Sequence, residues 1–261
     1  MRRLLKHELY KLFQSLTLKV MIAVTVGVAL ISSALLMLFV KSLNDTLDLG
    51  LGGVFGLTGS HSVASALSSP SLHIYFAVMI TLIVCSELRS KTMKNTLLAD
   101  FSRGEVYFAK FLTTITAITV LILIHTVIFV VSAIAIFGWG AQITVQSILV
   151  DVAAMFFMGL LLCCAVAAML NFFAYLLQNT ALVILIAVIP ILINALVIET
   201  LVVLGSGFFQ AVNKVSYFSV LSNFAADKTL TNFAYYAVTM LVMLTGFTAG
   251  GYFVFKKKEL K

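Results

Sequence analysis

The segment SELRSKTMKNTLLADFSRGEVYFAK, residues 86–110, is polar and lies between two long apolar runs. It carries five of the 17 Lys and Arg residues in a 261-residue chain that is 62% hydrophobic and only 10% charged. Since a soluble domain typically has about 25% charged residues, a water-soluble fold of this composition would expose large apolar patches. We therefore expect an integral membrane protein in which this segment connects two spans.

Six apolar runs are candidates for helices that cross the bilayer, which takes about 20 residues. They cover residues 18–40, 71–85, 106–137, 148–177, 181–204 and 233–255. Fourteen of the 17 basic residues lie in the N-terminal segment, the 86–110 segment and the C-terminal tail, and the positive-inside rule places these parts in the cytoplasm. The expected fold is an all-α integral membrane protein, a single domain over residues 1–261, with six transmembrane helices and cytoplasmic N- and C-termini.

Two further segments are predicted to lie along the membrane surface. Residues 1–17 are amphipathic, which favours an interfacial helix over a flank that only follows the positive-inside rule. Its apolar face is predicted to consist of Leu5, Leu9, Leu12, Phe13 and Leu16. The opposite face is predicted to carry Arg2, Lys6, His7, Lys11 and Gln14. Residues 205–232 carry apolar side chains at near-helical spacing, which indicates an amphipathic or re-entrant segment on the outer side.

A helix start is predicted near the end of the 86–110 segment. The run Ser102-Arg103-Gly104-Glu105 matches a capping box, in which the Ser102 hydroxyl and the Glu105 carboxylate each accept a backbone N–H of the other residue. The capped helix should continue as the 106–137 span. Lys110, about two turns further on, is expected to snorkel to the lipid headgroups.

The 86–110 segment resembles the signature segment of type-2 ABC exporter permeases. The resemblance is carried by Glu87, Lys91-Thr92, Leu97-Leu98, Ser102-Arg103 and Lys110, although the family often has a proline before the Ser-Arg pair, where this chain has Phe101. In that family the loop between spans two and three forms a coupling helix that docks on a separate ATPase subunit. The resemblance implies that residues 86–105 form this coupling segment. The implied contact residues are Glu87, Arg89, Lys91, Thr92, Lys94, Leu97, Leu98, Ser102 and Arg103.

The chain lacks the G-x-x-x-x-G-K-[ST] phosphate loop, so we expect no enzyme activity and no cofactor in this chain. ATP and magnesium are expected in a partner ABC ATPase, in two copies, together with a second permease as a homodimer or heterodimer. The chain is similar to small permeases that export, or confer immunity to, antimicrobial peptides of the lantibiotic or phenol-soluble-modulin type. The resemblance thus implies export of an amphipathic peptide and a bacterial plasma membrane, with no nucleic-acid partner.

Three ionisable residues inside apolar runs are candidates for a transport pathway: Asp151, Glu199 and His125. Such groups are costly in a membrane unless paired or hydrated. Asp151 could instead lie at the outer headgroups, and His125 could simply bond a neighbouring helix. Glu199 follows Pro190, a predicted kink, and could suit a cationic substrate.

Three alternatives to the exporter stay open at this point. An ion-gradient-driven secondary transporter or channel would use the same three ionisable residues. A membrane enzyme is disfavoured because neither H-E-x-x-H nor G-x-S-x-G occurs, and the four histidines show no metal-ligand spacing. A non-transporting membrane anchor or signalling partner is the third.

The 233–255 run also contains Gly246 and Gly250, a small-xxx-small pair that allows helices to approach closely. The pair could pack within the chain, which we favour, or form a seam between two copies.

Overall fold

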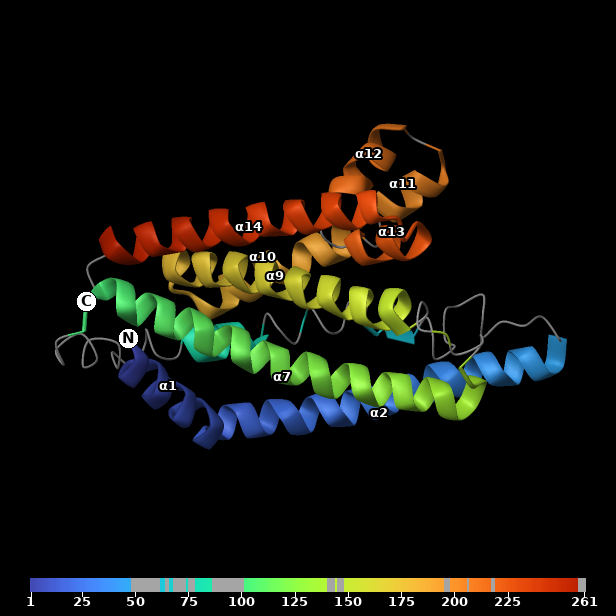
Figure 1. Ribbon diagram of the computed structural model, residues 1–261, viewed down its shortest axis with the longest axis horizontal. Coiled ribbons are helices and arrows are strands. Elements are labelled where there is room, and N and C mark those ends of the chain that lie inside the picture. Colours follow the sequence, from blue (N-terminus) through green and yellow to red (C-terminus); the bar gives the residue numbers. More distant parts are fainter. Residues whose placement is uncertain are drawn as a thin grey trace.

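A computed structural model of the chain describes residues 1–47, 62–63, 66–67, 74, 78–85, 101–139, 144, 148–194, 198–205, 207–216 and 219–257. All regular elements in these ranges are helices, which confirms the predicted all-α class. Long helices lie side by side in an elongated bundle (Figure 1). In chain order the elements are α1 (Arg2–Gln14), α2 (Leu16–Leu47), α7 (Arg103–Phe137), the π-helix η1 (Ile148–Ala154), α9 (Met155–Leu177), α10 (Thr180–Ile193), α11 (Glu199–Val203), α12 (Gly207–Val215), α13 (Val220–Ala226) and α14 (Leu230–Lys257).

Four helices in the described ranges are long and apolar enough to cross a membrane. They comprise Leu16–Leu43, Arg103–Phe137, Val152–Leu177 and Leu230–Lys257, and they coincide with four of the six predicted runs. At a rise of 1.5 Å per residue, α7 is about 50 Å long and exceeds the roughly 30 Å bilayer core. At least one end of α7 must therefore project beyond the hydrocarbon.

The other two predicted spans are each described only in part. Within the 181–204 run, α10 ends at Ile193 and α11 begins at Glu199, and residues 195–197 between them lie outside the described part of the chain. Pro190 lies inside α10, where it removes a backbone donor and weakens the final turn. In the 71–85 run the structure describes residues 74 and 78–85, all of which are helical.

Helix α7 contacts other helices on two of its sides. On one side it packs against α1 and α2, and on the other it contacts α9 and α14 (Figure 1). Helix α9 is the most enclosed span and packs most extensively against α14. The short helices α12 and α13 lie at the end of the bundle opposite the start of α1 (Figure 1).

An aromatic cluster packs α7 against α9 and α14. Tyr107 of α7 is fully buried, and its ring centroid lies 5.5 Å from that of Tyr175 and 5.9 Å from those of Tyr252 and Phe255. The Tyr107 hydroxyl donates to the carbonyl oxygen of Thr248, 2.9 Å away on α14. The cluster therefore combines ring packing with one directional bond.

Glycines of α14 make this close approach possible. A Cβ added at Gly251 would overlap the Tyr107 hydroxyl, and one added at Gly250 would lie 3.3 Å from the Phe172 ring of α9. A Cβ at Gly246 would meet open space. Gly250 thus packs within the chain, as favoured from the sequence. The second close contact is made by Gly251, which the small-xxx-small pattern did not indicate.

We predict that Gly251→Ala destabilises the protein by about 1–3 kcal/mol, because the added methyl group displaces the wedged Tyr107 ring. Gly246→Ala is the matched control and should lower stability little or not at all. Thermal unfolding in detergent measures both. Equal melting temperatures for the two variants would contradict the close α7–α14 contact.

Candidate functional site at the basic end of the bundle

The start of α1, the start of α7 and the end of α14 meet at one end of the bundle, which we call the basic end (Figure 1). Its described cationic residues include Arg2, Arg3, Lys6, Arg103, Lys110, Lys256 and Lys257. The predicted coupling segment leads directly into this end, since its residues Ser102 and Arg103 begin α7. The other predicted contact residues lie outside the described residues: Glu87, Arg89, Lys91, Thr92, Lys94, Leu97 and Leu98.

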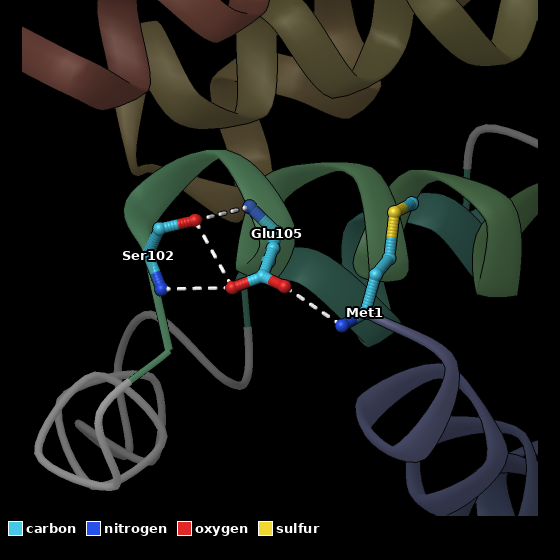
Figure 2. A network of polar contacts seen from close by, with 3 residues as sticks. All are labelled: Met1, Ser102 and Glu105. Carbon is cyan, nitrogen blue, oxygen red and sulfur yellow. Dashed lines mark hydrogen bonds and ion pairs between the residues drawn. The ribbon is translucent and has the colours of Figure 1, made fainter.

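The predicted capping box is confirmed (Figure 2). The backbone N–H of Glu105 donates to Ser102 Oγ at 3.2 Å, and the backbone N–H of Ser102 donates to Glu105 Oε2 at 3.1 Å. The other carboxylate oxygen, Oε1, accepts from the amino group of Met1 at 2.7 Å. One carboxylate therefore both caps α7 and contacts the start of α1.

Arg103 connects the same helix start to α14. Its Nη1 donates to the carbonyl oxygen of Lys256 at 2.7 Å. Carbonyls in the last turn of a helix lack intrahelical donors, and this end of the helix carries partial negative charge. A guanidinium group is thus well suited to hold the end of α14 beside the start of α7.

The face by which α1 packs on α7 overlaps the predicted apolar stripe only in part. The residues that α1 buries are Leu4, Glu8 and Leu12, spaced at i, i+4 and i+8. Of the predicted stripe, Leu12 is buried, Leu5 and Leu9 are half-buried, and Phe13 and Leu16 are exposed. The stripe was read from hydrophobicity alone, which counts lipid-facing and protein-facing residues alike, whereas the packed face includes a charged residue.

A buried ion pair holds this contact. Lys110 Nζ of α7 donates to Glu8 Oε2 of α1, and the two residues are only 5% and 4% exposed. The expectation that Lys110 snorkels to the headgroups was therefore wrong. Snorkelling moves an ammonium group toward water. Here the Glu8 carboxylate lies within reach of the Lys110 ammonium group and replaces water as its partner.

Glu8 is the residue at this end that sequence reasoning missed. Its signal was present, because an acidic residue spaced four residues from both Leu4 and Leu12 occupies the centre of one helix face. Burial of a carboxylate in such a position requires a cationic partner. The only way to identify that partner as Lys110, 102 residues further on, was to know that α1 folds back on α7.

The predicted pathway candidates are not at the basic end. His125 is 1% exposed within α7, stacks on Phe129 with ring centroids 6.4 Å apart, and lies beside the Ala66 backbone without a well-formed hydrogen bond among the described residues. Asp151 belongs to η1 and Glu199 begins α11, and the placement of both side chains falls outside what the structure describes.

The polar contacts at the basic end join its helices to one another. Glu8 and Lys110 link α1 to α7, and Arg103 links α7 to α14. Among the described residues, no group of three or more His, Cys, Asp and Glu side chains could hold a metal ion.

We predict that Glu8→Leu alone lowers the free energy of unfolding by about 3 kcal/mol or more, because it strands the buried Lys110 ammonium. The double variant Glu8→Leu/Lys110→Met should recover most of this loss, since it removes both charges. Chemical or thermal unfolding of the single and double variants in detergent completes the cycle. Additive losses would contradict a direct pair.

We predict that Ser102→Ala costs about 1 kcal/mol of local stability in the first turn of α7, because the Glu105 N–H loses its acceptor. Ser102→Thr, which keeps a hydroxyl, should cost less. Amide hydrogen exchange of the first turn of α7 measures the effect. Unchanged exchange in Ser102→Ala would show that the cap does not limit opening there.

Comparison of the sequence with protein-family models and with curated proteins gives no match.

Proposed function

We propose that the chain is the membrane-spanning subunit of an ATP-driven exporter, with six spans, both termini in the cytoplasm, and residues 86–105 as the coupling segment. It would pair with two copies of a separate ABC ATPase and with a second permease subunit in a bacterial plasma membrane. ATP and magnesium would be bound by the ATPase subunits.

The observation that carries this proposal is the buried Glu8–Lys110 pair. The pair fixes the amphipathic helix α1 to the second turn of α7, the helix that begins at the end of the proposed coupling segment. A force applied to a docked coupling segment would thus reach α1 and α7 together. Such an arrangement would let a separate ATPase subunit move α1 and α7 as one unit.

The outward surface of the bundle is consistent with further subunits and lipid. In the most apolar stretch of α14 only 17% is buried, whereas 56% of the corresponding stretch of α9 is buried. Its large exposed side chains include Val238, Val242 and Phe253. An apolar surface of this kind is covered in a membrane by acyl chains or by a second permease.

For the substrate we propose an amphipathic peptide of the antimicrobial or toxin class. The support is the resemblance to small peptide-exporting permeases, together with the aromatic content of 21 Phe and 8 Tyr residues. A substrate with an apolar face could leave the bilayer along such a surface.

An ion-gradient-driven transporter is the second candidate, and one observation favours it. His125 is buried in α7 without a well-formed hydrogen bond among the described residues, and an intramembrane ionisable side chain is a candidate for proton transfer. Protonophore-sensitive transport in the absence of ATP would select this candidate.

We predict that purification in mild detergent retains a near-stoichiometric protein that carries a phosphate loop. Simultaneous reversal of two charges, Glu87→Lys with Arg89→Glu, should abolish its retention and ATP-driven peptide transport, because the resemblance implies that both side chains contact the ATPase. Quantitative mass spectrometry and transport in vesicles provide the readouts.

The matched control is Lys41→Glu near the far end of α2, which should retain the partner. Retention and transport unchanged by the double reversal would refute the coupling assignment. Absence of any ATPase partner from folded protein would refute the exporter and favour the gradient-driven alternative.

A further inference from the structure

A cavity of about 450 Å³ lies between the end of α13 and the first turns of α14. This is the end of the bundle opposite the basic end (Figure 1). Its volume falls within the range of ligand sites in proteins, about 300–1,000 Å³. The described residues that line it are Asn223, Ala226, Asp227, Asn232, Tyr235 and Tyr236.

The turn between the two helices places a carboxylate at this cavity. Asp227 is the C-cap residue of α13, and its backbone N–H donates to the carbonyl oxygen of Asn223 at 3.2 Å. The Asn232 side chain returns from α14 and donates from Nδ2 to Asp227 Oδ2 at 2.8 Å and to the Asp227 carbonyl at 3.1 Å. Asn232 thereby orients the carboxylate through one of its two oxygens.

Two aromatic rings line the cavity beside this carboxylate. The Tyr235 and Tyr236 ring centroids lie 5.2 Å apart with the planes at 73°. Tyr236 is 7% exposed and therefore fixed by packing, whereas Tyr235 is 49% exposed. Non-parallel tyrosine rings beside a carboxylate are the components from which aromatic cages for ammonium groups are built.

The charge of the lining selects the sign of the ligand. The described lining holds one carboxylate, two amides and two tyrosines, and it includes no cationic side chain. Lys228 follows Asp227 in the chain but is not part of this lining. A cation is therefore favoured over an anion.

We infer that this cavity binds an organic ammonium group, held by the Asp227 carboxylate and the rings of Tyr235 and Tyr236. The group could belong to a phospholipid headgroup or to a soluble organic cation. The inference is independent of the proposed exporter function, because it needs neither an ATPase nor a transported substrate.

The test uses the full chain in maltoside micelles, which carry no ammonium group, titrated with choline and followed by ligand-observed NMR. Saturable binding is expected. Asp227→Asn should weaken it about tenfold and Tyr235→Leu several-fold, whereas Asp227→Glu should retain most of it. Tyr10→Leu, which removes an exposed tyrosine from α1, is the matched control and should bind choline normally.

Adding phosphatidylethanolamine to the micelles distinguishes the two sources. A rise in the apparent Kd for choline supports the site and identifies a lipid headgroup as an occupant. An unchanged Kd supports the site and identifies it as one for soluble cations. The inference is overturned if choline shows no saturable binding, or if Asp227→Asn, folded as judged by its melting temperature, binds like the unaltered chain, as it would if the tyrosines were only interfacial anchors.

Discussion

The ion pair between Glu8 and Lys110 is the constraint on which the basic end depends. Each group is almost completely removed from solvent, so each would carry a desolvation penalty of several kcal/mol without the other. Apolar contacts such as those of Leu4 and Leu12 allow a helix to slide or rotate with little change in energy. A buried charge pair does not, and it therefore fixes both the rotation of α1 and its position along α7.

The spans are held by a different kind of contact. Lipid chains are as apolar as leucine, so helices in a bilayer associate through close packing and directional bonds rather than through a hydrophobic drive. The contact of Tyr107 with Gly251 and with the Thr248 carbonyl combines both of these. Together with Arg103 at the Lys256 carbonyl, it ties α7 to α14 at two levels.

Elements with a local signal were predictable from the sequence. The all-helical class, four long apolar helices and the Ser102–Glu105 capping box each follow from neighbouring residues. Pairings between distant segments were not, because composition does not show which face of α1 meets protein and which meets lipid. The partner of Glu8 and the close approach at Gly251 therefore emerge only once the helices are placed together.

In the proposed exporter, these contacts decide how motion would spread. Separating α1 from α7 would break a buried ion pair, so a pull on the coupling segment is better met by moving both helices together. Arg103 and Tyr107 extend this unit to α14.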